Sequence, residues 1–212
     1  MKKTLTLFIT TIFIIILFFI FSANIHITSD HTSIYPLSLD LLKGNIWLKD
    51  WILGTNNFYF TEIIPYAFTT MLAIPLSLAL RIVTSSVWPI IALFTYYFFD
   101  LSKLFDRKFA YFSFFFILII MILSPITAPT LLAPNSHNNL YLLFLLQLHI
   151  IKHYLNTGKL HWLIYSSLLG AALQFSEGFS TMVIVAPLAL FSLISIFIKK
   201  EKKYIYLFLS VM

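Results

Sequence analysis

Long apolar runs separated by short polar stretches dominate the chain. When the sequence is cut at its charged residues and histidines, the remaining runs suit helices, which need about 20 mostly apolar residues to cross a bilayer. Apolar and polar positions do not alternate as they do in half-buried strands. The predicted membrane spans are Leu5 to Asn24, Ile82 to Phe99, Phe109 to Leu123, Asn139 to Tyr154, Leu160 to Phe175 and Phe179 to Ile198, with a seventh beginning at Tyr204. The pattern therefore predicts an all-α, polytopic membrane protein with about 6–7 transmembrane helices, in a single integral membrane domain over residues 1–212.

The apolar segment from Ile63 to Leu80 fits this pattern less well, because Pro65 and Pro75 interrupt it. Each proline removes a helical hydrogen bond, so a spanning helix with two of them needs neighbours to satisfy the freed carbonyls. Lysine and arginine collect in cytoplasmic loops. If the segment does not cross, eleven of the 14 basic residues fall inside and three outside, and a crossing reverses these numbers. We therefore expect the segment to lie along the outer face or to dip into it.

The same rule orients the chain, because Lys2 and Lys3 place the N-terminus in the cytoplasm. The apolar run after them is longer than the about 7 to 15 residues of a secretory signal, so we expect an uncleaved first helix. Residues 25–81 then form an outside loop that carries juxtamembrane helices. The many Phe, Ile, Lys and Asn residues, with only 5 Gly, are typical of an AT-rich bacterial genome. We expect a multi-pass protein of the bacterial inner membrane.

Composition and charge narrow the function classes. With 60% hydrophobic residues and a mean hydropathy of +0.92, the chain is more apolar than soluble domains are. A net charge of +6 would suggest nucleic acid in a soluble protein, but the cytoplasmic loops account for this charge, so no nucleic-acid partner is expected. The chain has no cysteine, which excludes disulfides, thiolate metal sites and a cysteine nucleophile.

Most of the outside acidic residues lie in the first outside loop. Asp30 follows the first helix by a few residues, near the level at which a lipid-borne substrate presents its headgroup. A carboxylate held there against apolar surface has a raised pKa and suits a general base, and a solvated loop acid is the alternative. Asp40 lies in "LSLDLLKGN", a predicted short helix, and is expected on its exposed face. Asp50 and Trp51 are expected to form an interfacial anchor.

Glu62 and Arg81 flank the proline-containing segment. Glu62 stands at its entrance, where a carboxylate can cap the helix N-terminus or hold a sugar hydroxyl. Arg81 follows its last residue, and a planar guanidinium at the outer face suits a phosphate. The alternative for Arg81 is a helix-end arginine that extends to the headgroup region. Both residues are candidates for substrate binding.

Two histidines complete the candidate residues. His31, beside Asp30, can ligate a metal or donate to a phosphate, and a surface histidine is the alternative. His137 lies between Asn135 and Asn138 in a Pro-rich outside loop, where these side chains can bind a sugar or form a polar turn.

Strongly polar residues are rare within the later spans. Gln147, His149 and Gln174 are the notable ones, and Gln174 has the same two interpretations as the polar loop residues, sugar binding or local structure. The small residues Ser166, Ser167, Gly170 and Ala171 follow a stripe that favours close packing of helices over ligand binding.

A set of short motifs occurs in a fixed order along the first third of the chain. Asp30 and His31 follow the first helix, "FTEIIPY" supplies Glu62 and Pro65, an apolar segment runs to Leu80, and Arg81 opens "RIVTSSVWPIIALFTYYFF". In this order the chain resembles the GT-C class of membrane glycosyltransferases, in the branch of protein O-mannosyltransferases and the aminoarabinose transferases of lipid A. Members of that branch have an acidic pair after the first helix, then an aromatic, an acid, two residues and a proline before a juxtamembrane helix.

The resemblance implies transfer of a sugar from a polyprenyl-phosphate donor to a cell-envelope acceptor on the outer face of the membrane. Asp30 would deprotonate the acceptor hydroxyl, Glu62 would position donor or acceptor, and Arg81 would bind the lipid phosphate. Charge develops on the departing phosphate, so a fixed cation there lowers the barrier. His31 and His137 would contribute to substrate binding.

The chain departs from the family pattern in two ways. His31 replaces the second acid of the pair, so mechanisms with and without a divalent metal both stay open, and no other cofactor is expected. The family has further helices, whereas this chain ends at Met212 as a seventh helix begins, so we expect an N-terminal part, and an inactive fragment is one hypothesis. Two alternatives from other classes are a membrane transporter or flippase and a non-catalytic membrane assembly subunit.

Overall fold

The structure is a computed structural model, and it describes residues 2–23, 32–51, 58–99, 116, 119–120, 123, 138–178 and 180–212. Every extended element among these residues is a helix, so the predicted all-α class is confirmed. The chain divides into two compact units: unit 1 contains Met1–Trp51 and Glu62–Leu142, and unit 2 contains Ile52–Thr61 and Leu143–Met212.

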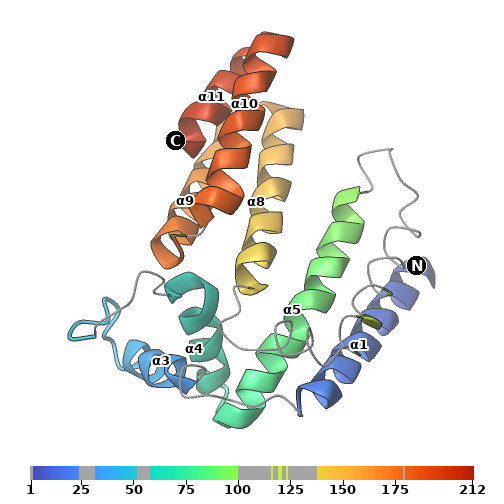
Figure 1. The fold of residues 1–212 in the computed structure, drawn as a ribbon, viewed down its shortest axis with the longest axis vertical. Helices are drawn as coiled ribbons and strands as arrows, with labels where there is room; N and C mark the ends of the chain where they lie inside the picture. The colour runs from blue at the N-terminus through green and yellow to red at the C-terminus, as the bar shows by residue number, and fades with distance from the viewer. Residues whose placement is uncertain are drawn as a thin grey trace. The chain divides into compact units, whose positions relative to one another are not determined.

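Unit 1 is built on two long helices that pack side by side, α1 (Lys2–Ser22) and α5 (Leu76–Phe99) (Figure 1). Ile14 and Phe18, one turn apart on α1, are buried, as are Val87 and Ile91, one turn apart on α5. Residues four apart lie on the same face of a helix, so each helix turns one apolar stripe inward. This packing buries one face of each helix within unit 1.

Short helices form the rest of the described part of unit 1. The nine-residue helix α3 (Ile34–Leu42) packs against α4 (Ile64–Met71), and α4 follows directly from the π-helical turn η1 (Tyr59–Ile63). The Ser38 hydroxyl of α3 is fully buried and bonds to the carbonyl oxygens of Ile34 at 2.9 Å and Ile63 at 3.0 Å. This hydroxyl ties α3 to the start of α4.

The proline-containing segment differs from the prediction of one juxtamembrane helix from Ile63 to Leu80. It is two helices, because α4 ends at Met71 and α5 begins at Leu76, ahead of the predicted start at Ile82. Ala73 adopts a left-handed φ of 55° between them, and Pro75, which has no N–H to donate, precedes α5. The 8 residues of α4 extend about 12 Å, too short to cross a bilayer core of about 30 Å.

Unit 2 is a bundle of antiparallel helical hairpins (Figure 1). Its elements are α8 (Asn138–Thr157, which begins in unit 1), α9 (Leu160–Ser176), the π-helical turn η2 (Thr181–Val185), α10 (Ala186–Lys199) and α11 (Lys202–Val211). Gly158, with a φ of 66°, makes the tight turn between α8 and α9, a conformation that glycine adopts without strain. The Tyr154 hydroxyl donates to the Lys203 carbonyl at 3.1 Å and joins α8 to α11.

Two helical stretches, Leu76–Thr95 and Thr181–Lys199, are long and apolar enough to cross a membrane, and Phe8–Ser22 is a shorter apolar helix. Only 22% of the Thr181–Lys199 stretch is buried inside the protein, so it is not the core helix of a soluble fold. Its exposed side chains include Phe197 and Ile198, which are 72% and 73% exposed. Large exposed apolar surfaces mark membrane or protein contacts, and these helices indicate association with a membrane.

The helix bounds agree with most predicted spans to within a few residues. The largest difference is the early start of α5, and the predicted span Phe109 to Leu123 lies mostly outside the described residues. In the part of the chain that the structure describes, the helices that meet the length and hydropathy requirement for a crossing are fewer than the predicted six or seven.

Candidate functional site

The described acidic residues of the predicted outside loop, over residues 25–81, have different environments, and Asp40 has a structural one. Its carboxylate accepts hydrogen bonds from Asn45 Nδ2 at 2.6 Å and from Trp51 Nε1 at 3.0 Å. Asn45 also accepts from the Lys49 backbone N–H at 2.8 Å, so these side chains together close the turn after α3. The hydrogen bond from Asn45, followed by that from Trp51, lowers the pKa of Asp40 from its usual value. Asp40 was predicted on the exposed face of its helix; the structure leaves it partly exposed and adds these two hydrogen bonds to its carboxylate.

Glu62 lies in η1 and is only 2% exposed. It is not the N-cap of α4, because Ile63 occupies that position and α4 continues from η1. Pro65 stands in the first turn of α4, where its missing N–H breaks no hydrogen bond. Glu62 is thus a buried carboxylate in the first turn of η1, just before α4.

Tyr66 lies one helical turn after Glu62 and is 1% exposed. Its hydroxyl has no hydrogen-bond partner among the described residues. Burial, and secondarily the negative charge of Glu62, raises the pKa of Tyr66 well above its usual value, so the phenol keeps its proton at neutral pH. A buried carboxylate and a buried phenol thus lie one turn apart, the first a hydrogen-bond acceptor and the second a donor. The sequence shows the four-residue spacing of Tyr66 from Glu62, but not that both side chains are buried.

Arg81 was expected to open a helix, and the structure places it inside α5, on the second turn after Leu76. Its Nε atom is buried and has no hydrogen-bond partner among the described residues. The backbone carbonyl of Arg81 accepts a hydrogen bond from the Thr84 hydroxyl at 3.4 Å, and this bond does not involve the guanidinium. A partly covered arginine in an apolar helix is costly unless an anion pairs with it, and no such anion is found among the described residues.

The structure relates the candidate residues only in part. Glu62 and Tyr66 share one helical turn, and α4 packs against α5, the helix that carries Arg81. Asp30, His31 and His137 lie outside the described residues. Within the described ranges, no three His, Asp or Glu side chains form a group that could hold a metal ion.

The later polar residues form a second cluster, within unit 2. Gln147 is 3% exposed, and its Nε2 donates to the Ser166 carbonyl at 3.2 Å. His149 and His153, one turn apart on α8, bring their Nε2 atoms to 3.1 Å, and the His153 ring stacks on Trp162. The contacts of Gln147 with Ser166 and of His153 with Trp162 depend on how α8 packs on α9, and the hydropathy pattern does not reveal this packing.

Comparison with protein-family models, with curated proteins and with solved structures finds no match to this chain.

Proposed function

We propose that this chain is a multi-pass protein of the bacterial inner membrane that transfers a sugar from a polyprenyl-phosphate donor to a cell-envelope acceptor on the outer face. The observation that carries the proposal is the buried Nε of Arg81, which has no hydrogen-bond partner among the described residues and lies on a helix apolar enough to span a membrane. Ionisable residues in such helices are rare and mark functional sites. The proposal gives this cation its counter-ion, the phosphate of the donor lipid.

The depth of Arg81 is consistent with a headgroup ligand. Arg81 lies about 8 Å along α5 from its first residue, Leu76, at 1.5 Å per residue. A long arginine side chain extends from that depth towards the membrane surface, where lipid phosphates lie. Its planar fork binds phosphate through two parallel hydrogen bonds, which a lysine does not reproduce.

The other candidate residues have roles that follow from their chemistry. Asp30 takes the proton of the acceptor hydroxyl, whose oxygen then bonds to the anomeric carbon of the sugar as the bond from that carbon to the phosphate breaks. The phosphate leaves with the electron pair, and Arg81 neutralises its charge. Glu62 is assigned to positioning donor or acceptor, and Tyr66, buried one turn away, packs beside it. His31 and His137 are assigned to substrate binding.

The role of Arg81 is tested by lipid binding. Purified protein in detergent micelles is titrated with a polyprenyl phosphate and with a polyprenol of equal length, and bound lipid is counted by native mass spectrometry. We expect Arg81→Gln to weaken phosphate-lipid binding by about tenfold or more, because hydrogen bonds to a charged group contribute about 1.5–3 kcal/mol. Arg81→Lys should keep the charge and recover part of the affinity.

The matched control is Lys49→Gln, which removes an exposed cation from the same outside loop. It should leave the affinity within about twofold, because exposed charges contribute little. Equal binding of polyprenol and polyprenyl phosphate to the unmodified chain would contradict the proposal. So would an Arg81→Gln variant that binds the phosphate lipid normally, since Arg81 would then be a helix-end arginine without a ligand.

The role of Asp30 separates an enzyme from the other classes. Asp30→Asn preserves size and removes the base, so sugar transfer from radiolabelled polyprenyl-phosphate donors in membranes should fall at least about 100-fold. Binding of polyprenyl phosphate should be retained. Asp50→Asn, in the same loop, is the control and should transfer normally. A transporter or an assembly subunit would instead keep its cellular function in the Asp30→Asn variant.

A further inference from the structure

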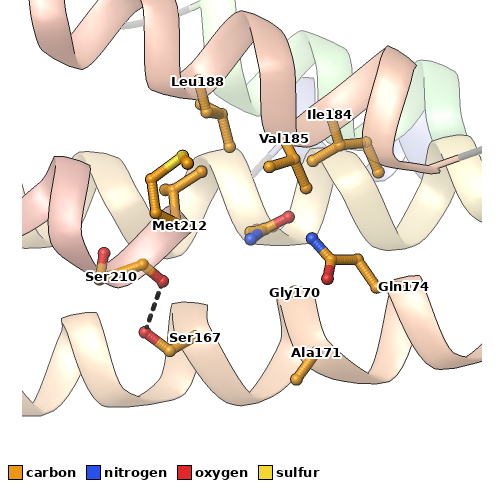
Figure 2. Close-up of a pocket in the computed structure, with 11 residues that line it drawn as sticks. Ser167, Gly170, Ala171, Gln174, Ile184, Val185, Leu188, Ser210 and Met212 are labelled. Carbon is orange, nitrogen blue, oxygen red and sulfur yellow. Dashed lines mark hydrogen bonds between the residues drawn. The ribbon is translucent and has the colours of Figure 1, made fainter.

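A cavity of about 140 Å³ lies within unit 2, lined by α8, α9, α11 and the continuous η2–α10 helix (Figure 2). This volume is close to the about 150 Å³ of an apolar cavity that takes up benzene, so it holds a group of a few heavy atoms. In Figure 2 the amide of Gln174 turns into the cavity. The polar part of the lining includes Gln147, Ser167 and Gln174, and the apolar part includes Ile184, Val185 and Leu188.

The amide of Gln147 is held in one orientation. One of its polar atoms faces the Ser166 carbonyl at 3.2 Å, and because a carbonyl only accepts, that atom must be Nε2. Gly170 of α9 packs against this amide so closely that an added Cβ would lie 2.8 Å from Gln147 Nε2. The other amide atom, Oε1, is buried and accepts no hydrogen bond from any described residue. Leaving a buried acceptor unsatisfied is costly, so a ligand with a donor is favoured here.

The lining restricts the charge of that ligand. No charged side chain lines the cavity, so an ion would lose its hydration without gaining a side-chain counter-charge. The Ser167 hydroxyl already donates to the Ser210 carbonyl at 3.0 Å, the bond drawn in Figure 2. A neutral O–H group can donate to Gln147 Oε1 and accept from the Gln174 amide. The complementary ligand is therefore uncharged and carries a hydroxyl next to an apolar body.

The surroundings of the cavity indicate where such a ligand comes from. Ile184 and Leu188 belong to Thr181–Lys199, a stretch apolar enough to cross a membrane, and lie about 5 to 10 Å along it from Thr181. Leu168 and Phe175, which adjoin lining residues of α9, are 65% and 55% exposed. An apolar surface around a partly open cavity at this depth faces lipid, and the hydroxyl end of a lipid lies near the membrane interface.

We propose that this cavity binds the hydroxyl end of an uncharged membrane lipid, with Gln147 Oε1 as the acceptor of the lipid hydroxyl. The cavity admits only the hydroxyl and the first carbons, and the rest of the chain continues into the bilayer. The inference is independent of the proposed sugar transfer, because the residues assigned to that reaction do not line this cavity.

Photocrosslinking tests the proposal. The full chain in phosphatidylcholine vesicles is exposed to a long-chain fatty alcohol with a diazirine next to the hydroxyl end, to its methyl ether and to the matching fatty acid. Labelled residues are identified by mass spectrometry of peptides. We expect the alcohol to label lining residues such as Ile184 and Leu188 about five- to tenfold more than the ether, which cannot donate, and more than the carboxylate.

Two variants with matched controls locate the acceptor. Gln147→Leu keeps the side-chain size and removes Oε1, so it should abolish the preference for alcohol over ether, whereas Asn156→Leu, at an exposed amide of the same helix, should preserve it. Gly170→Ala should reduce the preference by displacing the Gln147 amide. Gly178→Ala should not, because an added Cβ there meets nothing within 4 Å.

The comparison within the unmodified chain decides the proposal even where a variant folds poorly. Equal labelling of the lining by alcohol and ether would overturn it, and so would labelling confined to other surfaces. Carboxylate labelling as strong as that of the alcohol would show that the cavity accepts an anion, which excludes the proposed class. A Gln147→Leu variant that keeps the alcohol preference would remove the acceptor role.

Discussion

Among single residues, two polar side chains carry the functional proposals, because a buried polar atom without a hydrogen-bond partner destabilises the protein. Arg81 has a buried Nε and Gln147 a buried Oε1, and neither atom has a partner among the described residues. Arg81 Nε belongs to a cation, which an anion would stabilise. Gln147 Oε1 is a neutral acceptor, which a hydrogen-bond donor would satisfy. The two proposed sites would therefore discriminate between charged and uncharged lipids by different chemistry.

Asp40 gives a prediction on pH. Its pKa is lowered in the folded chain by the bonds from Asn45 and Trp51, so these bonds stabilise the turn fully above the usual pKa of 3.8. The stabilisation is lost as the pH falls through the lowered pKa. Tryptophan fluorescence should therefore stay constant from neutral pH to about pH 5 and change on further acidification, as Trp51 Nε1 loses its acceptor.

Asparagine variants separate this effect from general acid unfolding. Asp40→Asn should remove the acid-induced fluorescence change, because the residue at position 40 no longer titrates. Asp50→Asn, a neighbouring exposed acid, should retain it. An identical acid transition in the Asp40→Asn variant would show that another group controls the environment of the tryptophans.

At the scale of elements, the break between α4 and α5 determines where Arg81 lies. Without it, one helix from Ile64 would carry Arg81 about 25 Å along its axis, at 1.5 Å per residue. The left-handed Ala73 and the following Pro75 restart the helix at Leu76, which brings Arg81 within two turns of a helix end. The break thus keeps the arginine within reach of a membrane surface.

Substitutions at Ala73 test the strain at this break. A left-handed conformation costs about 1–2 kcal/mol for residues with a Cβ, a cost that Ala73 already carries and glycine avoids. Valine is less tolerant still because it is β-branched, so Ala73→Val should destabilise the protein by about 1–2 kcal/mol, and Ala73→Gly should be neutral or stabilising by up to about 1 kcal/mol. The measurement is thermal unfolding in detergent followed by circular dichroism.

Ala186 provides the control for these substitutions. It is also exposed but has a helical φ of −61°, so Ala186→Val should cost only the helix-propensity difference of about 0.5 kcal/mol. If valine destabilised both positions equally, or if Ala73→Gly destabilised strongly, the backbone at Ala73 would not be left-handed in the protein.

Particular residues explain how much the sequence could predict. The helix Leu160–Ser176 matches the predicted Leu160 to Phe175 because a glycine and a lysine mark its start. The prolines at 65 and 75 marked the interrupted segment, but hydropathy does not reveal that Pro65 fits a first helical turn whereas Pro75 ends a break. Gln147 and Gly170 were each visible as unusual, and their contact was not, because it depends on the packing of two helices.

At the scale of the whole molecule, exposed apolar surface occurs in both units. In unit 1, Phe13 and Ile20 of α1 are 63% and 60% exposed, and in unit 2, Phe197 and Ile198 of α10 are 72% and 73% exposed. Soluble monomers rarely expose contiguous apolar surface of this kind. The distribution of lysine and arginine then gives the expected orientation, with α1 and α5 each crossing once and the loop between them outside.

Cysteine labelling in intact cells tests this orientation, and the chain has no native cysteine to interfere. Trp47 is 87% exposed and suits the outside loop better than Asn45, whose side chain bonds to Asp40. Single cysteines at Trp47 and Ser102 are treated with a membrane-impermeant thiol reagent. We expect labelling at position 47 alone, and at both positions once the membrane is permeabilised.

The pattern of labelling also bears on the proposed site. Labelling at 47 alone would keep the N-terminal end of α5, and with it Arg81, at the outer face, where the proposed function requires the polyprenyl-linked sugar. Labelling at both positions in intact cells would require a further crossing between them, which would move the end of α5 near Arg81 to the cytoplasmic face. Arg81 and the Asp30 carboxylate would then lie on opposite sides of the membrane, so the two residues could not act on one donor lipid, whereas the neutral lipid cavity of unit 2 would be unaffected.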